Sequence, residues 1–381
     1  MIQRLGLTFP VLGAFFLVAA TAGDASAKPA VGDGEVLAPI GAEASYCAGE
    51  AGCNGGFPEG VVIVNDLVYV AGPATFGTAG KGPSVVTVLH RSNGDLVTEI
   101  PIEGEFTEFE HALSGIAADG DGNVYALSTQ LGVVRIERHG QTWSQSSYAA
   151  PLPDLPACSV GGPTPCAPTF IDLPPVSNEM TFDDAGNLYI TDSTQATIFR
   201  VAPGGGAPEV WFQSPLLAGS LAAPFPFGAN GIKVSPDRAW IYVVETFDPF
   251  DPTTGHVYRV PLVDAPVEGD LELVHTFSGF SVPDSLAFGE SGQLYVSLAG
   301  PLPSIAVLDA DGAQVGLLTG PDGSAIPFDE PATFAFDDAR KSLVVANHDI
   351  LPEPGETSPN FALLRVYVGE RGDELPAPHL P

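Results

Sequence analysis

One pattern recurs six times along the 381 residues and limits the folds that the chain can adopt. Its clearest copy, at residues 178–191 (NEMTFDDAGNLYIT), has a short apolar alternation, an acidic turn with glycine, and a second alternation that contains tyrosine. The copies begin at residues 59, 114, 178, 230, 284 and 332, so successive copies are 55, 64, 52, 54 and 48 residues apart. Alternation with a period of two is typical of β-strands, and the turn between the alternations predicts a hairpin.

The spacing of the copies is too long for one hairpin and suits a four-stranded blade. A third β-rich segment follows several hairpins, at residues 196–201, 256–260 and 304–308. No apolar stripe with a helical period extends beyond the N-terminal segment, which excludes a helical solenoid. The sequence therefore predicts an all-β fold, a six-bladed β-propeller with four-stranded blades. Because the ring must close, we expect a strand at residues 35–40 to complete the last blade beside residues 361–368.

The two ends of the chain are expected to lie outside the ring. Residues 1–27 combine Arg4, a mostly apolar run and a small-residue cleavage signal at residues 25–27, as in a secretory signal peptide. An uncleaved membrane anchor is the alternative, although the apolar run is short. We expect an N-terminal extension with the ring-closing strand at residues 28–57, the propeller at residues 58–369 and a C-terminal tail at residues 370–381. The mature protein would then be exported, either to the periplasm or to the extracellular medium.

Export would place the four cysteines in an oxidising compartment, where pairing is the expected state. Cys47 lies close to Cys53 in the sequence, and Cys158 lies close to Cys166, each pair in a segment rich in glycine or proline. Such segments can bend enough to close a small loop, and the spacings fit no zinc pattern. The sequence therefore predicts two local disulfides.

The charge of the chain restricts its partners. It contains 14 basic and 46 acidic residues, for a net charge of −32. This charge repels phosphate backbones and anionic lipids, so we expect no nucleic-acid partner and no membrane contact after removal of the signal peptide. Cations and neutral small molecules are the favoured ligands.

Equivalent positions of the blades face one axis in a propeller, so residues that are far apart in the sequence converge there. The six copies start with Glu59, Ser114, Asn178, Asn230, Asp284 and Ala332. Four of these carry the carboxylate and amide oxygens that Ca²⁺ prefers, whereas zinc or copper would call for Cys or His. We expect Glu59, Asn230 and Asp284 to bind a Ca²⁺ ion, with Asn178 bound directly or through water. The alternative is that Asx residues only open turns before strands.

The second strand of each hairpin returns antiparallel to the first, so its last residues lie beside the first residues of its partner. This places Asp192, Glu245 and the pair Asn347 and His348 near the expected ion. His348 can titrate near neutral pH, which makes it a candidate proton shuttle. The alternative is a rim histidine that is solvated or packed against the next blade.

Several of these segments resemble the metal-binding strand starts of the regucalcin, gluconolactonase and luciferin-regenerating-enzyme superfamily of six-bladed propellers. The matching segments are residues 57–61 (FPEGV), 229–237 (ANGIKVSPD) and 283–287 (PDSLA), in the order that the superfamily shows. Asn178 and Glu179 resemble its Asn–Asp pair on blade three, which lies beside the ion and helps to bind substrate. The similarity runs from about residue 58 to about residue 348.

The resemblance implies hydrolysis of a lactone or ester, a small-molecule substrate, with a divalent cation as Lewis acid. Asp284 would act both as a ligand and as a candidate base. Taken together, we assign catalysis to Asp284 and His348, and substrate binding to Asn178, Glu179 and Glu245.

The chain also departs from the relatives that it resembles. Val176 occupies the position where gluconolactonases have an Arg that recognises a hydroxylated substrate, and Ser114 the position where related paraoxonases have a proposed catalytic His. An apolar loop at residues 221–227 precedes Asn230, which favours a less polar ligand than a sugar lactone. Two alternatives stay open: a non-catalytic exported propeller that binds a ligand or protein, and a strictosidine-synthase-like propeller that needs no metal.

Overall fold

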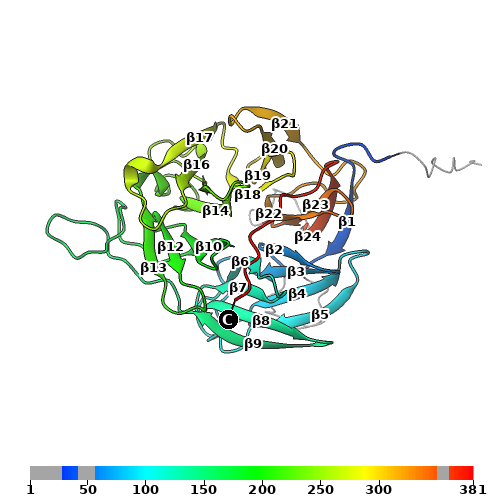
Figure 1. The fold of residues 1–381 in the computed structure, drawn as a ribbon, viewed down its shortest axis with the longest axis horizontal. Helices are drawn as coiled ribbons and strands as arrows, with labels where there is room; N and C mark the ends of the chain where they lie inside the picture. The colour runs from blue at the N-terminus through cyan, green and yellow to red at the C-terminus, as the bar shows by residue number, and fades with distance from the viewer. Residues whose placement is uncertain (1–27, 42–55, 350–359, 381) are drawn as a thin grey trace, which may run out of the picture.

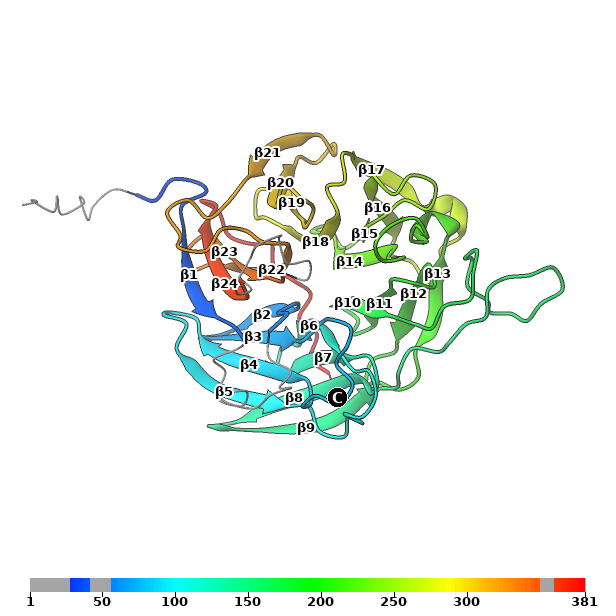
Figure 2. The same ribbon diagram turned by 180° about the vertical axis from the view of Figure 1, so that it is seen from behind.

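The computed structural model describes residues 28–41, 56–349 and 360–380. Six antiparallel sheets of four strands each surround a central axis (Figures 1 and 2), so the predicted six-bladed β-propeller is confirmed. Within the described ranges, no helix has both the length and the apolar composition that a bilayer crossing requires. The expected signal peptide at residues 1–27 and the expected Cys47–Cys53 disulfide lie outside the described residues.

The first three blades follow the order of the chain, each from the innermost to the outermost strand. They contain β2 (Val61–Val64), β3 (Leu67–Gly72), β4 (Val85–His90) and β5 (Leu96–Pro101); β6 (Leu113–Ala118), β7 (Val124–Ser128), β8 (Gly132–His139) and β9 (Thr142–Ala149); and β10 (Ser177–Phe182), β11 (Leu188–Asp192), β12 (Thr197–Val201) and β13 (Glu209–Gln213). Each inner hairpin coincides with one copy of the sequence repeat, because the period-2 alternation gives a strand two distinct faces.

The next two blades have the same order, and a short 3₁₀ helix, η2 (Glu268–Asp270), lies before the outermost strand of blade four. They contain β14 (Ala229–Val234), β15 (Trp240–Glu245), β16 (Gly255–Pro261) and β17 (Glu272–Phe277); and β18 (Pro283–Phe288), β19 (Leu294–Leu298), β20 (Ser304–Leu308) and β21 (Gln314–Leu318). A second 3₁₀ helix, η1 (Pro215–Leu217), lies in the connection between blades three and four.

The sixth blade joins the two ends of the propeller. Its inner strands are β22 (Pro331–Asp337), β23 (Ser342–Asn347) and β24 (Ala362–Tyr367), and its outermost strand is β1 (Gly34–Pro39). Strand β1 pairs antiparallel with β24, with Gly34 opposite Val366 and Pro39 opposite Ala362. The expected ring-closing strand is therefore present, and it removes the exposed edge that the last blade would otherwise have.

The hydrophobic core consists of six clusters, each filling the space between two neighbouring blades. Between blades two and three, Tyr125 packs edge-on against Phe182 with ring centroids 5.1 Å apart. Toward the axis the inner strands come too close for side chains at some positions. A Cβ on Gly60 would lie 2.5 Å from the Ser114 carbonyl oxygen, and one on Gly231 would lie 2.6 Å from that of Asp284. Glycine is required at these positions because the backbones themselves are in contact.

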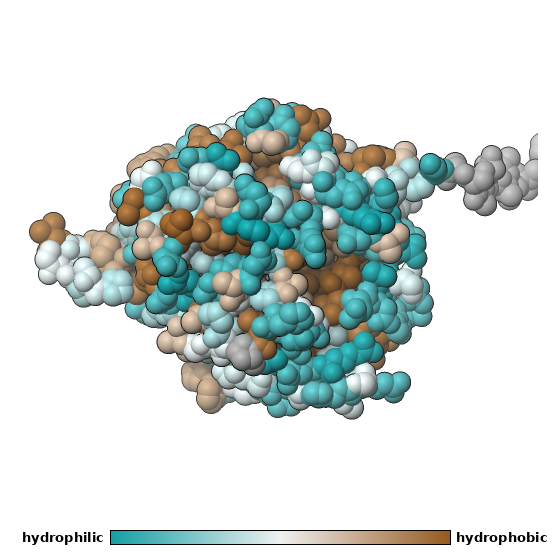
Figure 3. Space-filling model, in the orientation of Figure 1, coloured by the Kyte–Doolittle hydropathy of each residue, from teal (hydrophilic) through white to brown (hydrophobic). Residues whose placement is uncertain are grey.

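The C-terminal segment crosses the face of the ring that carries the hairpin turns of the inner strands (Figure 1, red). Gly372 forms a bridge with Gly289, the amide of Gly120 donates to the Pro378 carbonyl, and Leu380 is buried between blades two and three. Hydrophilic residues predominate on this face, with apolar residues scattered among them (Figure 3). The segment covers this end of the ring, and the inner strands begin at the opposite end.

Candidate functional site

One cavity of about 520 Å³ opens at the end of the ring where the inner strands begin. Four side chains with oxygen ligands line it, and we call them the axial group: Glu59, Asn178, Asn230 and Asp284. Glu59 lies just before β2, and the other three are the second residues of β10, β14 and β18. The structure thus brings into one cavity four residues that the sequence spreads over 225 positions.

A bulge at the start of most inner strands accounts for the direction of these side chains. The pairing register shifts between Ser177 and Met180 in β10, between Ala229 and Ile232 in β14, and between Pro283 and Leu286 in β18. A bulge places an extra residue in one strand and turns the side chains beside it, which is common next to functional sites. Asn178, Asn230 and Asp284 all lie within these bulges.

Glu59 is buried and Asp284 is half-buried, and loss of hydration controls the ionisation of both carboxyl groups. Glu59 is 5% exposed, and loss of hydration, together with the charge of Glu179, raises its pKa to about 8. Burial also raises the pKa of Asp284 well above its usual range; the charge of Glu59 adds to this effect, and a hydrogen bond with Asn230 opposes it. Among the described residues, no Lys or Arg forms an ion pair with either group. Glu59 therefore holds its proton near neutral pH in the metal-free protein, and the pKa of Asp284 shifts in the same direction.

Asn230 is held in place by a second polar contact. Its Nδ2 donates to Thr246 Oγ1 at 2.9 Å, and its side chain also hydrogen-bonds Asp284. Thr246 follows β15 and lines the cavity as well. The amide is therefore oriented from blade four toward the carboxyl group of blade five, which sets the geometry of the axial group without a charged partner.

His348 lies in the same cavity, directly after β23. Its Nε2 lies 2.7 Å from the Ala74 carbonyl oxygen, which can only accept, so Nε2 carries a hydrogen. Its Nδ1 lies 3.3 Å from Glu59 Oε2. Burial lowers the pKa of His348, so the neutral ring presents the Nδ1 lone pair to the protonated carboxyl group of Glu59. This contact gives a route for a proton between Glu59 and His348 Nδ1.

Glu179, expected to bind substrate, does not line the cavity. It is 3% exposed and lies one residue further along its strand than Asn178. Its carboxylate forms an ion pair with Lys233 and accepts hydrogen bonds from the Ile232 amide at 3.1 Å and from Ser285 Oγ at 3.0 Å. The side chain is enclosed among its partners on blades four and five, and three other blades have glycine at the equivalent position.

Glu245, the other expected substrate ligand, also points away from the cavity. Its backbone lies opposite Ala229 as expected, but its carboxylate is fully buried and contacts His256 on the next strand. Consecutive residues of a strand face opposite sides, so the residue that faces the cavity is the following one, Thr246. Asp192, at the equivalent place in blade three, likewise binds the loop that follows it, accepting from the amides of Thr194 and Gln195.

The sequence reasoning missed Glu330, a buried cavity-lining acid that directly precedes β22. It lies two residues before the start of its repeat copy, in phase with Val176 and Val282, which also line the cavity. That phase was the signal that could have identified it. Phe57, Val282 and Glu330 share this position and all have left-handed φ values of 48°, 52° and 48°. Such values are unfavourable for bulky residues and occur mostly at functional sites.

Aromatic and proline side chains form the wall of the cavity. Phe225 and Phe227 of the apolar loop stack at 5.5 Å between centroids, and Phe225 stacks on Phe76 at 5.8 Å. Other apolar residues that line the cavity are Pro174, Pro175, Val176, Pro224, Phe247, Phe280 and Val282. The loop that the sequence indicated as apolar is therefore part of the binding cavity, and polar oxygen donors lie against an apolar wall.

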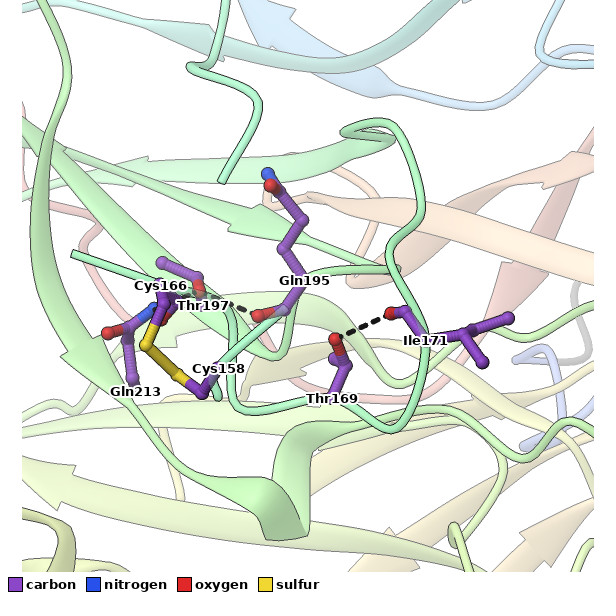
Figure 4. The surroundings of a disulfide bond; sticks show 7 residues. All are labelled: Cys158, Cys166, Thr169, Ile171, Gln195, Thr197 and Gln213. Atoms are coloured by element: carbon purple, nitrogen blue, oxygen red, sulfur yellow. Dashed lines mark hydrogen bonds between the residues drawn. A yellow bond between two sulfur atoms is a disulfide. The ribbon is translucent and has the colours of Figure 1, made fainter. Parts of the chain in front are cut away.

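The long connection between blades two and three contributes Pro174 and Pro175 to this wall. Its middle projects from the ring and contains the predicted Cys158–Cys166 disulfide, which is confirmed (Figures 1 and 4). The Gln213 side chain donates to the Cys166 carbonyl at 3.0 Å and to Thr197 Oγ1 at 2.8 Å, which ties the base of the connection to blade three (Figure 4).

Solved structures share this fold at low sequence identity. No family model matches the sequence, and no curated protein matches it. The calcium-binding protein regucalcin from Agrobacterium tumefaciens is similar, with a TM-score of 0.59 and 17% identity over 91% of this chain and 97% of that one. A luciferin-regenerating enzyme has a TM-score of 0.54 and 13% identity over 84% of this chain and 95% of that one.

A third similar structure is the gluconolactonase XC5397 from Xanthomonas campestris, with a TM-score of 0.52 and 14% identity over 89% of this chain and 98% of that one. The three names are those of the superfamily that the strand starts resemble. At these identities the comparisons establish the six-bladed fold, and the resemblance holds at the level of that fold.

Proposed function

We propose that the protein is an exported, Ca²⁺-dependent hydrolase that acts on a lactone or ester of low polarity. The observation that carries the proposal is the axial group: the buried Glu59, the half-buried Asp284 and two carboxamides that meet in one apolar-walled cavity. Two acids close together without a Lys or Arg partner are costly to ionise, and a divalent cation would remove that cost. Oxygen-only donors favour a hard cation, and the calcium-binding regucalcin has the same fold.

Glu59, Asn230 and Asp284 would hold the cation, with Asn178 bound directly or through water. When bound, the cation supplies Lewis acidity that polarises the carbonyl group of the substrate. Thr246 keeps the Asn230 amide oriented for this task. His348 Nδ1 can take a proton from the cavity side or exchange one with Glu59, while the Ala74 carbonyl holds Nε2–H in place. Asp284 is the other candidate base, because its carboxyl group faces the same space.

The cavity wall indicates the substrate class. Phe76, Phe225 and Phe227 offer aromatic surface, and Val176 offers no charged or hydrogen-bonding group. A lactone or ester with an aliphatic or aromatic substituent would bury apolar area there, at roughly 25 cal/mol per Å². A polyhydroxylated sugar lactone would lose hydrogen bonds to water without replacing them along this wall.

Export and the absence of macromolecular partners remain part of the proposal. The disulfide supports an oxidising compartment, periplasmic or extracellular, and the N-terminal pattern supports a signal peptide. The net charge of −32 favours a small, neutral or cationic ligand and disfavours nucleic acids and anionic membranes.

The proposal is tested with the purified mature chain, its metal content, and a panel of aliphatic lactones, aryl esters and sugar lactones with and without chelator. We expect one tightly held Ca²⁺, turnover of the apolar substrates, and loss of turnover after chelation that Ca²⁺ restores. Asp284→Asn should remove both Ca²⁺ binding and turnover. The matched control is Asp309→Asn, in an exposed hairpin turn where an amide oxygen can still accept the Asp311 and Ala313 amides.

Two results would contradict the proposal. Bound Ca²⁺ without turnover of any member of the panel would favour the non-catalytic propeller, in which the ion is structural. Turnover that is unchanged by chelator and by Asp284→Asn would favour the strictosidine-synthase-like alternative, which needs no metal.

A further inference from the structure

A second group of potential metal ligands lies in blade four, outside the cavity. We call it the side cluster: Glu245, Asp248 and His256, each of which offers one ligand atom within 4.8 Å of the others. Glu245 ends β15 and His256 lies in β16 directly opposite it, while Asp248 belongs to the loop that joins the two strands. His256 Nδ1 lies 2.8 Å from Glu245 Oε2 and 3.8 Å from Asp248 Oδ2.

Asp248 is held so that one oxygen faces the histidine. Its Oδ1 accepts hydrogen bonds from the Phe250 amide at 2.7 Å and the Asp251 amide at 2.8 Å. Its own amide donates to the Thr254 carbonyl at 3.0 Å, which closes the loop. Because the turn occupies Oδ1, Oδ2 is left for His256. The loop therefore positions the carboxylate before any ligand binds.

A buried oxygen atom of Glu245 is an independent indication that the side cluster binds an ion. The Glu245 side chain is fully buried, and within the described part of the chain its Oε1 has no hydrogen-bond partner. A buried polar atom without a partner costs about 1–3 kcal/mol, and native structures contain few of them. A bound cation would give this orphaned oxygen a partner.

The donor set of the side cluster differs from that of the axial group. One imidazole nitrogen and two carboxylates suit a borderline divalent ion such as Zn²⁺, whereas the axial group offers oxygen alone. Two carboxylates and a neutral imidazole would balance the charge of such an ion. The Asp248 and His256 side chains are 16% and 11% exposed, so an ion can enter from solvent. We propose that Glu245, Asp248 and His256 form a second metal site, separate from the axial group, for a divalent transition-metal ion of the Zn²⁺ class.

The site would brace the connection that leads into the cavity. Thr246 and Phe247 lie between Glu245 and Asp248 in the chain, and both line the cavity. Thr246 holds the Asn230 amide, and Phe247 packs on Phe280 with centroids 5.6 Å apart. A metal ion bound by Glu245 and Asp248, the residues on either side of this dipeptide, would fix the end of β15 and the following loop to each other. Its role is thus structural, and it supports the wall and one axial ligand.

The test uses the untagged mature chain, freed of metal and then saturated with Ca²⁺ so that the axial group is filled. We expect calorimetry to show one further equivalent of Zn²⁺, and Co²⁺ in its place to give a visible absorption band from a His-ligated ion. Asp248→Asn keeps the Oδ1 acceptor of the turn and should weaken Zn²⁺ binding more than about 100-fold, since even a ligand's hydrogen-bonding partner contributes about 10- to 100-fold. His256→Asn should have the same effect.

Matched controls separate this site from other sites. Asp251→Asn, in the same loop, and His275→Asn, on the neighbouring strand, should leave Zn²⁺ binding unchanged. Asp284→Asn should also leave the Co²⁺ band unchanged, so that failure of the axial proposal and failure of this one are distinguishable. The proposal is overturned if the Ca²⁺-saturated protein takes up no Zn²⁺, if Asp248→Asn and His256→Asn both retain full affinity, or if the band disappears in Asp284→Asn.

Discussion

Glu179 and the carboxyl groups of the axial group lie in the same channel, yet the protein treats them in opposite ways. Glu179 is enclosed one residue further along the strands, and Lys233, Ser285 and the Ile232 amide satisfy its oxygens. Glu59 is also buried and Asp284 is half-buried, but their polar partners are His348 and Asn230 rather than a Lys or Arg. The difference separates a carboxylate that stabilises the fold from two that the fold leaves without a counter-charge.

The Lys233 ammonium group neutralises the Glu179 carboxylate, and their ion pair closes that carboxylate to other ligands. Burial without a Lys or Arg partner raises the pKa of Glu59 and of Asp284, and a bound cation would favour the deprotonated, ligating form of both groups. Glu179, a buried carboxylate with a basic partner, is thus an internal reference for the two carboxyl groups of the axial group. Variants at Lys233 and Asp284, together with the pH dependence of stability, test this difference between Glu179 and the axial group.

The largest change in stability is expected when Lys233, the ion-pair partner of Glu179, is replaced. Lys233→Met would leave the Glu179 carboxylate buried without its cation, and breaking a buried pair in this way costs about 3–5 kcal/mol. Urea unfolding of the metal-free protein measures this cost. The double variant Lys233→Met with Glu179→Gln should regain part of the loss. If the single variant is as stable as the parent, the ion pair does not stabilise Glu179, and Glu179 no longer differs from the carboxyl groups of the axial group in this respect.

Asp284→Asn should have the opposite pattern, because it removes a half-buried acid that has no Lys or Arg partner. We expect the free energy of unfolding of the metal-free variant to be unchanged or increased. At Ca²⁺ concentrations roughly 100 times the Kd, the parent should gain about 3 kcal/mol that the variant does not gain. Thermal unfolding with and without Ca²⁺ tests both statements. A metal-free variant that is strongly destabilised would show that Asp284 has a structural role like that of Glu179.

The pH dependence of stability should also distinguish the metal-free and Ca²⁺-bound protein. The folded-state pKa of Glu59 is raised to about 8, so between about pH 4.5 and 8 its carboxyl group holds a proton in the native state that it has lost in the unfolded state. Stability of the metal-free protein should therefore fall as the pH rises through this window, by up to about 1.4 kcal/mol per pH unit for Glu59, and the raised pKa of Asp284 contributes in the same direction.

Ca²⁺ should remove or reverse this fall, because the bound ion requires the deprotonated groups and its affinity rises with pH. Unfolding midpoints at a series of pH values, with chelator or with Ca²⁺, provide the measurement. Glu59→Gln should make the metal-free slope shallower. Equal slopes with chelator and with Ca²⁺ would contradict the assignment of these groups as ligands.

The smallest effect is expected at the apolar wall. Phe227→Ala should raise KM for an apolar ester about tenfold, equivalent to about 1.4 kcal/mol, with little change in kcat, because the ring contributes binding area and does not reach the reacting atoms. Phe250→Ala is a matched control, since this exposed phenylalanine is not part of the cavity wall. An equal change in both variants would mean that the wall does not bind the substrate.

The sequence predicted much of the fold because each copy of the repeat encodes its own hairpin. The alternation fixes two faces per strand, and the acidic turn fixes where the chain reverses. The residues of the axial group could be predicted together because they occupy equivalent positions of the repeat, and equivalent positions of a closed ring face one axis. Glu330 follows the same logic and could have been identified from its phase with Val176 and Val282.

Glu179 and Glu245, which the sequence indicated as substrate ligands, do not line the cavity because of their side-chain directions at strand starts and ends. Each lies next to a cavity-facing residue, Asn178 and Thr246 respectively, and a shift of one residue reverses the face. The bulges at the strand starts set that direction, and they depend on how the blades pack around the axis. The side cluster was missed altogether, because His256 and Asp248 belong to a strand and a loop whose contact exists only after β15 and β16 pair.

The sequence by itself determined the ring of six blades, the disulfide in the long connection and the set of oxygen donors at the axis, because each follows from a local period or a short spacing. Tertiary structure alone decided which carboxylates are buried with a cation and which without one. That choice depends on distances of a few ångströms between different blades, which no local pattern in the chain specifies.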